Sequence, residues 1–231
     1  MTVRIGLLRM DVLSVRSPED AGDYPGLYER MFDDLGVELL DVPMFRGDTP
    51  ASLADCDGWV VTGSRHSVYD DHPWIATAEE VVREAIAEEV PLVGICFGHQ
   101  LLARALGGTV EKADVGWKIG AQEYEATEPL PWLDGTTSYT LIASHQDQVV
   151  EPPSDAVVWS RGDGCPVAGM RVGDRAWTVQ GHPEFTPGVA AEIFRSRVEK
   201  LGADAVERAV ESMTRPLDNR RIAEAIVETV R

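Results

Sequence analysis

The sequence predicts an α/β fold with a mostly parallel central sheet and added antiparallel strands. In the first half of the chain, short β-rich runs alternate with segments of helical spacing. This alternation is typical of βαβ units, which build a parallel sheet with helices on both faces. Between residues 109 and 180, short β-like runs follow one another with turns between them. We expect these later strands to extend the sheet in antiparallel fashion.

Each element of the first half follows from a local pattern. In the helix expected over residues 25–35, apolar residues recur at helical spacing and a glycine follows. The run GWVVT at residues 58–62 is continuously apolar, as a central strand buried on both faces would be. The other strands are expected at residues 3–10, 37–42 and 92–95, and the other helices at 74–89 and 99–106.

The second half ends in helices. Strands are expected at residues 118–125, 139–143, 156–160, 167–172 and 176–180, with a hairpin turn at 172–175 and a loop at 129–137. Helices are expected at residues 187–201, 203–213 and 219–230. We expect one domain over residues 1–231, with 203–231 as a C-terminal helical extension. The apolar face of this extension either packs on the sheet or contacts an oligomer or another partner.

The composition argues against several classes of function. The chain has 231 residues, of which 44% are hydrophobic, and a formal net charge of −18. An acidic surface repels phosphate backbones and anionic headgroups, so we expect no nucleic-acid partner and no membrane partner. No apolar run approaches the ~20 residues that a membrane span needs, and we expect no signal peptide.

Cysteine usage favours a reducing compartment. The three cysteines, Cys56, Cys96 and Cys165, are widely spaced and form no C-x-x-C motif. This pattern argues against a disulfide framework and a zinc site, so we expect a cytoplasmic protein without a metal. The sequence also shows no P-loop and no G-x-G-x-x-G motif. We therefore expect no cofactor and no ATP-driven acceptor domain within it.

Cys96 is the first candidate functional residue. It stands in GICFG at residues 94–98, after a predicted strand and before a predicted helix. Glycines two positions before and after it let a sharp strand-to-helix turn close, as in a nucleophile elbow. The helix N-terminus then favours a thiolate, and the amide of Phe97 can stabilise an oxyanion. The alternative is a cysteine that packs as a small core residue.

A candidate base for this nucleophile is His182 in QGHPEF. Glu184 follows two residues later, and in extended backbone such positions project to the same side. Pro183 favours extended geometry at His182, so the carboxylate can orient the imidazole and stabilise its protonated form. The alternative is a solvent-exposed pair in a turn.

Together these motifs resemble the class I glutamine amidotransferase family. GICFGHQ at residues 94–100 is similar to the family's nucleophile motif, and GHPEF at 181–185 to its His–Glu motif, in the same chain order. VTGSRHSVYDD at 61–71 resembles its oxyanion and substrate loop, and SHQDQV at 144–149 resembles a segment of the glutaminase part of GMP synthase. The resemblance covers about residues 3–200 and implies a flavodoxin-like three-layer sandwich.

The resemblance implies a role for each matching catalytic residue. Cys96 would be the nucleophile, His182 the base and Glu184 the group that orients it. Cys96 would attack a side-chain amide and release ammonia or an amine, and water would then hydrolyse the γ-glutamyl thioester. His182 would protonate the leaving nitrogen and afterwards activate the water.

Further residues would hold the substrate and the oxyanion. The oxyanion hole would consist of the Phe97 amide and the backbone of Gly63 and Ser64, and Gln100 would lie near the bound γ-glutamyl group. The family loop of GMP synthase has S-G-G-P where this sequence has TGSR at residues 62–65. Arg65 replaces the proline; it could reach a substrate carboxylate or be an ordinary solvated arginine.

Two other residues have open interpretations. His145 could line the site, or it could pair with Asp147 on a loop. Trp117 lies in GWKIG, which resembles stand-alone members of the family such as γ-glutamyl peptidase-like proteins, but it could equally pack in the core.

Three hypotheses for the function remain. The first is glutamine amidotransferase-type hydrolysis of glutamine or another γ-glutamyl compound, with a separate synthetase as a candidate partner on which the chain could dock. The second is a free-standing γ-glutamyl peptide hydrolase. The third is a non-catalytic regulatory relative, which an intact Cys96, His182 and Glu184 argue against. An oligomer is possible in each case.

Overall fold

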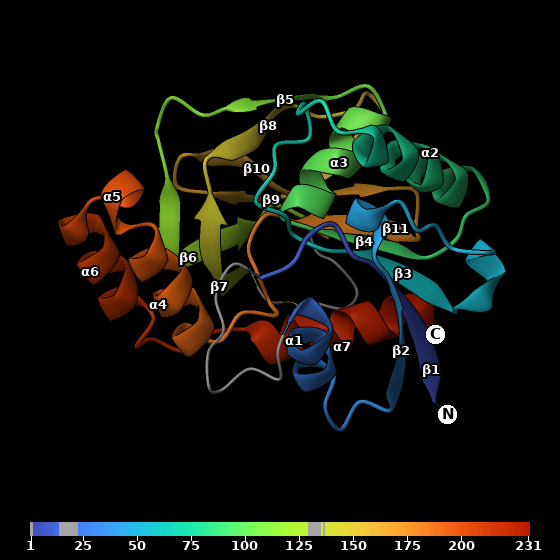
Figure 1. Cartoon of the computed structure of the whole chain (residues 1–231), viewed down its shortest axis with the longest axis horizontal. Coiled ribbons are helices and arrows are strands. Elements are labelled where there is room, and N and C mark those ends of the chain that lie inside the picture. The colour runs from blue at the N-terminus through green and yellow to red at the C-terminus, as the bar shows by residue number, and fades with distance from the viewer. Residues whose placement is uncertain (1, 14–22, 129–134, 136) are drawn as a thin grey trace.

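The computed structural model describes residues 2–13, 23–128, 135 and 137–231. Its centre is a nine-stranded sheet with the strand order β2-β1-β3-β4-β11-β10-β9-β6-β7 (Figure 1). The first five strands in this order pair in parallel, and the remaining pairs are antiparallel. The predicted fold class, a mostly parallel sheet with antiparallel additions, is therefore confirmed.

The strands of the large sheet lie close to their predicted positions. They are β1 (Val3–Leu8), β2 (Val37–Val42), β3 (Gly58–Val61), β4 (Leu92–Ile95), β6 (Lys118–Ala126), β7 (Ser138–His145), β9 (Ala156–Gly162), β10 (Cys165–Val172) and β11 (Ala176–Val179). The predicted hairpin turn joins β10 to β11, where Val172 pairs with Ala176. Gly173 in this turn has a φ of +60°, which favours glycine.

Helices cover both faces of the sheet, so the fold has three layers. They are α1 (Tyr24–Met31), α2 (Pro73–Ala87), α3 (Phe97–Ala105), α4 (Pro187–Ser196), α5 (Val198–Leu201), α6 (Ala203–Ser212) and α7 (Asn219–Val230), with short 3-10 turns at Met44–Arg46 and Leu53–Asp55. One hydrophobic core contains buried side chains of α1, α4, α6 and α7, and a second contains those of α2 and α3. Figure 1 shows α2 and α3 across the sheet from α1 and α7.

The C-terminal helices pack on the main body of the protein. Val206 and Ala209 of α6 and Ile222 and Ile226 of α7 are buried in the first core, beside strands of the large sheet. The indole of Trp177 on β11 also donates a hydrogen bond to Thr229 of α7 at 2.8 Å. The apolar face of the extension thus covers the sheet, which is the first of the two alternatives.

Two features differ from the prediction. A second, two-stranded antiparallel sheet forms from β5 (Thr109–Lys112) and β8 (Asp147–Glu151), at positions where the sequence pattern predicts no strand. Their runs are short and mostly polar, and Val110 and Val149 bury their side chains in the second core. The single helix expected over residues 187–201 is interrupted at Arg197, which separates α4 from α5.

Most of the loop expected at residues 129–137 lies outside the described residues. Among the residues that the structure describes, no helix is both long and apolar enough to cross a membrane.

The parallel half of the sheet positions the candidate site. β3 and β4 are adjacent, with Val61 paired to Gly94, so their carboxyl ends meet at one edge. The loop after β3 and Cys96 after β4 therefore lie side by side. Ligands of open α/β sheets bind at this edge, beyond the carboxyl ends of the strands.

Candidate active site

Cys96 occupies the sharp turn between β4 and α3. Its φ of 52° and ψ of −98° are unusual for a residue with a side chain, and its backbone amide donates to the carbonyl oxygen of Val179 at 2.9 Å. A Cβ at Gly94 would lie 2.6 Å from the carbonyl oxygen of Gly98. A Cβ at Gly98 would lie 2.4 Å from the carbonyl oxygen of Val61. Both glycines are thus required for the turn to close.

The sulfur of Cys96 contacts Gln180, a glutamine outside the predicted set of site residues. Nε2 of Gln180 lies 3.6 Å from Sγ of Cys96. Oε1 of Gln180 accepts from Gln100 at 3.2 Å, and Gln100 also donates to the backbone oxygen of Asp147 at 2.8 Å. Gln100 is thus buried and connected to the Cys96 sulfur through Gln180. Side chains alternate between the two faces of an extended strand. Because Gln180 stands two residues before His182, this alternation indicates that it projects to the same side.

His182 and Glu184 form a buried ion pair. Nδ1 of His182 lies 2.8 Å from Oε1 of Glu184. The backbone amide of His182 donates to Ile142 of β7 at 2.8 Å, and its ring stacks on Phe185 at a centroid distance of 4.0 Å. The chain turns at Pro183 and Glu184 instead of staying extended, but the predicted contact forms. Both side chains are buried, which rules out the solvent-exposed alternative.

The environment of His182 favours its protonated form. Burial alone would lower its pKa, but the Glu184 carboxylate and the Cys96 sulfur outweigh this effect and raise the pKa to about 10. A hydrogen bond with Cys96 contributes to the same shift. The arrangement can therefore hold an imidazolium beside the Cys96 sulfur at neutral pH.

The loop after β3 lies against the histidine. A Cβ at Gly63 would be 2.9 Å from Cε1 of His182, so only glycine permits this approach. The hydroxyl of Thr62 donates to the Gly63 carbonyl oxygen at 3.1 Å. The Gly63–Ser64 peptide is trans, so its N–H and its carbonyl point in opposite directions. This contact fixes the orientation of the peptide.

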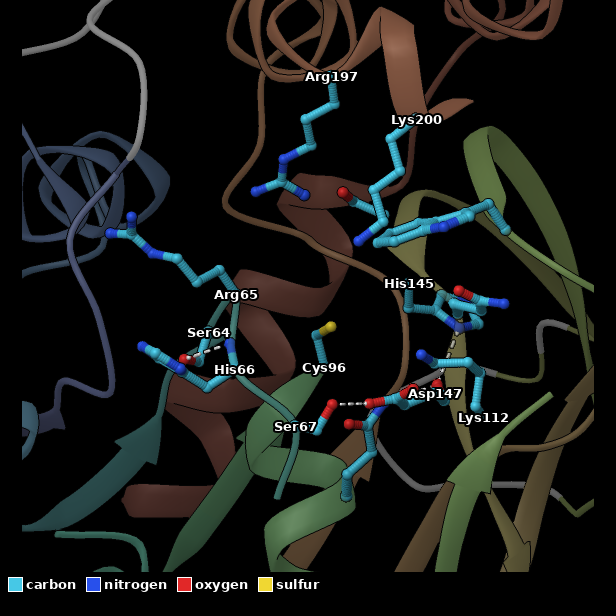
Figure 2. A pocket seen from close by; sticks show the side chains of 14 residues that line it. Ser64, Arg65, His66, Ser67, Cys96, Lys112, His145, Asp147, Arg197 and Lys200 are labelled. Atoms are coloured by element: carbon cyan, nitrogen blue, oxygen red, sulfur yellow. Dashed lines mark hydrogen bonds between the residues drawn. The ribbon is translucent and has the colours of Figure 1, made fainter. Parts of the chain in front are cut away.

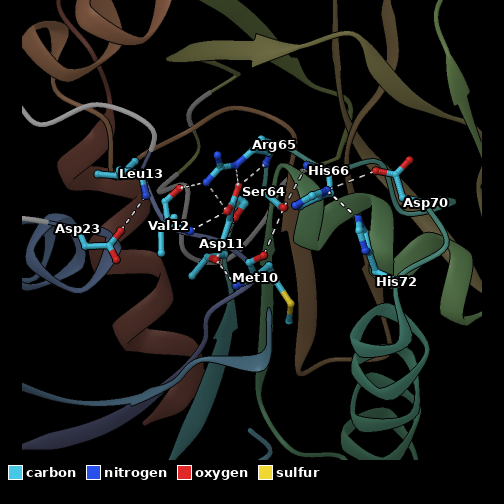
Figure 3. A network of polar contacts seen from close by, with 12 residues as sticks. Met10, Asp11, Val12, Leu13, Asp23, Ser64, Arg65, His66, Asp70 and His72 are labelled. Carbon is cyan, nitrogen blue, oxygen red and sulfur yellow. Dashed lines mark hydrogen bonds and ion pairs between the residues drawn. The ribbon is translucent and has the colours of Figure 1, made fainter. Parts of the chain in front are cut away.

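Arg65 is held by a carboxylate of the protein. Its Nε and Nη2 donate to the two oxygens of Asp11 at 2.7 and 2.8 Å, and its backbone amide donates to Asp11 at 2.9 Å (Figure 3). The contacts bind the loop after β3 to the loop after β1. Arg65 borders the pocket, but its guanidinium already has an anionic partner.

A pocket opens above Cys96, and cationic side chains surround it. Figure 2 shows Arg197 and Lys200 extending from the α4–α5 region toward the pocket, opposite Cys96. The break between α4 and α5 places Arg197 here, where it also lines a second pocket that contains His182. Lys112 of β5 approaches from the other side. A protein with a net charge of −18 thus concentrates positive charge at this pocket.

His145 and Trp117 both border the pocket. The ring of His145 contacts the backbone oxygen of Asp147 at 3.2 Å, and burial lowers its pKa to about 3, so it is neutral. The Asp147 carboxylate instead accepts from Ser67 and Tyr69 of the loop after β3. Trp117 is half-buried, and Nζ of Lys200 lies 4.7 Å from its ring centroid.

The other cysteines differ from Cys96 in their surroundings. Burial raises the pKa of Cys56 to about 11 and that of Cys165 to about 12, which keeps both as thiols. Neither residue borders the pocket above Cys96. All three cysteines are free.

The family model "Glutamine amidotransferase class-I" matches residues 23–201 of this chain. The chain belongs to the class I glutamine amidotransferase family. Membership confirms the resemblance and the predicted enzyme class, a cysteine-nucleophile amide hydrolase.

Two curated relatives show the range of proteins to which this class I amidotransferase is similar. It is 31% identical over 186 residues to gamma-glutamyl peptidase 2 of Arabidopsis thaliana, covering 78% of this chain and 75% of that protein. It is 32% identical over 176 residues to one subunit of the glutamine-hydrolyzing GMP synthase of Methanopyrus kandleri, covering 72% of this chain and 87% of the relative.

Solved structures agree with the amidotransferase fold. A glutamine amidotransferase from Methylobacillus flagellatus superposes with a TM-score of 0.75 at 26% identity, over 99% of this chain and 92% of that one. One from Thermotoga maritima superposes with a TM-score of 0.78 at 19% identity, over 100% and 96%. The predicted flavodoxin-like sandwich is confirmed.

Proposed function

We propose that this amidotransferase hydrolyses γ-glutamyl amides through a thioester on Cys96. The thiolate attacks the γ-carbonyl carbon, and the C–N bond breaks as His182 gives its proton to the leaving nitrogen. His182 then takes a proton from water, which attacks the thioester and releases glutamate and the thiolate. Glu184 holds the imidazole and stabilises its charge.

One observation carries this proposal. A cysteine in a strained elbow shares a hydrogen bond with a buried imidazole whose pKa is raised, and a carboxylate oxygen lies 2.8 Å from that imidazole. A core cysteine needs neither a glycine on each side nor a charged histidine. The arrangement matches the requirements of an activated thiol nucleophile.

The oxyanion of the tetrahedral intermediate is bound by two backbone amides in this proposal. Phe97 is the first residue of α3, so its amide has no acceptor within the helix and can donate to an oxyanion beside Cys96. We assign the second donor to the Ser64 amide, which belongs to the peptide whose carbonyl oxygen accepts from the Thr62 hydroxyl.

The cationic side chains favour a substrate with a carboxylate in its leaving group. Arg197 borders both the pocket of Cys96 and the pocket of His182, the residue that protonates the leaving amine in this proposal. Burial lowers the pKa of Arg197, so an anion bound there would offset the cost of its desolvation. No ion pair joins Arg197 to another residue of the described part of the chain. We therefore favour γ-glutamyl peptides over glutamine as substrates.

The test compares two peptides that differ only at the C-terminus. A γ-glutamyl dipeptide with a free carboxylate should be cleaved with a kcat/KM at least about tenfold above that of its C-terminal amide, since a charge-assisted contact contributes about 1.5–3 kcal/mol. Arg197→Gln should abolish this preference without slowing the amide substrate. Arg195→Gln, which changes an exposed arginine near the end of α4, should retain it. Equal rates for both peptides in the unchanged enzyme would contradict the assignment.

Activity on glutamine distinguishes the partner-dependent glutaminase from the free-standing peptide hydrolase. The relative from Methanopyrus kandleri is part of a GMP synthase, and a glutaminase subunit of this kind would release ammonia slowly until a synthetase docks. Cleavage of peptides without any partner, with weak or no cleavage of glutamine, supports the free-standing hydrolase. Failure to cleave either compound without a partner would favour the partner-dependent glutaminase.

A further inference from the structure

A cluster of metal-ligating side chains lies beside the pocket. His66 and Asp70 lie on the loop after β3, and His72 directly precedes α2 (Figure 3). Nδ1 of His66 lies 3.2 Å from Nε2 of His72 and 3.5 Å from Oδ2 of Asp70. We propose that these three side chains bind a divalent transition-metal ion, of which Zn²⁺ is the best chemical match.

The distances suit a tetrahedral ion. Zn²⁺ binds histidine nitrogen and carboxylate oxygen at about 2.0–2.2 Å, which places the ligand atoms about 3.3 Å apart. The two measured separations lie on either side of this value, and all three ligand atoms lie within 4.8 Å of one another. Two imidazoles and one carboxylate also form a ligand set typical of zinc with an open fourth position for water.

A hydrogen-bond network explains the cluster less well. The single Nδ1 atom of His66 faces both other groups, yet it carries at most one proton. If Nδ1 is protonated and donates to Asp70, it has no lone pair left to accept from Nε2 of His72. If it accepts from His72 instead, its lone pair faces the Asp70 carboxylate. Oδ2 of Asp70 already accepts the Ser67 amide at 3.0 Å. A metal ion satisfies one lone pair from each of the three residues at once.

The protein holds the ligands in place before an ion arrives. His72 precedes Pro73, which keeps its backbone extended, with a φ of −117° and a ψ of 125°. Its ring stacks on Trp74 at a centroid distance of 6.0 Å, and the Ser67 amide fixes the Asp70 carboxylate. About a third of each of the His66 and Asp70 side chains is exposed, at 32% and 38%, so an ion and a water can enter.

The metal would fix the loop that borders the active site. The His66 amide donates to the Ser64 hydroxyl at 3.2 Å, and Ser64, His66 and Ser67 line the pocket above Cys96. An ion shared by His66 and His72 would therefore attach this loop to the start of α2. Because the ion binds the folded state, it should raise the melting temperature in a concentration-dependent way.

The test uses the full chain carrying Cys96→Ala, so that the active-site thiol cannot bind the metal. Metal-free protein is titrated with Co²⁺ and then with Zn²⁺, followed by visible absorption and by thermal unfolding. We expect one equivalent of Co²⁺ in a tetrahedral site without a thiolate charge-transfer band, displacement by Zn²⁺, and a higher melting temperature with Zn²⁺. Binding independent of Cys96 separates this proposal from the hydrolysis itself.

Matched variants locate the site. In the same background, His72→Gln and Asp70→Asn should each weaken Zn²⁺ binding at least tenfold and abolish the gain in melting temperature. Asp71→Asn, which changes the exposed neighbouring carboxylate, should leave both unchanged. No stoichiometric binding, or binding that survives both His72→Gln and Asp70→Asn, would overturn the proposal.

Discussion

Gly98 of α3 and Val61 of β3 approach so closely that a Cβ on the glycine would lie 2.4 Å from the valine carbonyl oxygen. This contact sets how near the first turn of α3 lies to the end of β3. It therefore determines the distance between the Phe97 amide and the Gly63–Ser64 backbone, the two proposed sides of the oxyanion hole. The second glycine of the GICFG motif thus affects the geometry of the proposed site through its contact with Val61.

Gly98→Ala should therefore impair both stability and activity. The added methyl must push α3 away from β3, at a cost of about 1–3 kcal/mol in the free energy of unfolding, and the oxyanion donors would separate. Urea unfolding and kcat/KM on a γ-glutamyl substrate measure the two effects. Gly47→Ala is the control, since no atom lies within 4 Å and only the φ of +92° resists it. This control should lose stability while the folded protein keeps its kcat/KM.

Glu184→Gln should change the pH dependence of activity. His182 must be protonated to deliver a proton to the leaving nitrogen, so kcat/KM should fall as the pH rises through about 10. Without the carboxylate, the pKa of His182 decreases and the alkaline limb should move to lower pH. By analogy with serine enzymes, kcat/KM at its optimum should also fall, roughly 100- to 10,000-fold. An alkaline limb at the same pH in both proteins would contradict the assigned role.

Gln180→Glu tests the contact with sulfur. Nε2 of Gln180 lies 3.6 Å from Sγ of Cys96, and a carboxylate there would disfavour the thiolate by charge repulsion. We expect kcat/KM at neutral pH to fall at least about tenfold, which corresponds to about 1.4 kcal/mol. Thiol alkylation of Cys96 should slow in parallel. Gln122→Glu on β6, away from the pocket of Cys96, provides the charge-matched control, and an equal loss there would refute a local effect.

His99 should make the protein less stable in acid. The ring is buried between Thr178 and Val167, and burial lowers its pKa to about 4 from about 6.5. Between these two pH values, the His99 ring therefore binds a proton in the unfolded chain but not in the folded protein. The contribution of His99 to the free energy of unfolding is therefore fully present above pH 6.5. About 3 kcal/mol of it is lost as the pH falls toward 4. His99→Gln should flatten this slope in urea unfolding measured at a series of pH values; an unchanged slope would exclude His99 as its source.

The sequence predicts the parallel half of the fold well because its signals are local. The apolar run before Cys96, the flanking glycines and the spacing of His182 and Glu184 each act over a few residues. Their convergence follows from the rule that parallel strands end at one edge of the sheet. The elbow and the contact between imidazole and carboxylate are therefore predictable.

Other features depend on contacts between distant segments. β5 and β8 are short and polar, and they form because Val110 and Val149 reach a core built by α2 and α3. The break at Arg197 has no glycine or proline to mark it, so helical spacing continues through it. The pairing of Arg65 with Asp11 joins residues 54 positions apart. The cluster of His66, Asp70 and His72 also requires a folded loop, so the sequence alone predicts no metal site.

The most direct test of the central claim is mass spectrometry of the protein quenched in acid during turnover of a γ-glutamyl peptide. We predict one added γ-glutamyl group on the peptide that contains Cys96, none on those with Cys56 or Cys165, and none in the Cys96→Ala protein. The adduct should disappear when the substrate is exhausted, because water hydrolyses the thioester. Turnover that persists in Cys96→Ala, or an adduct on another residue, would contradict the account.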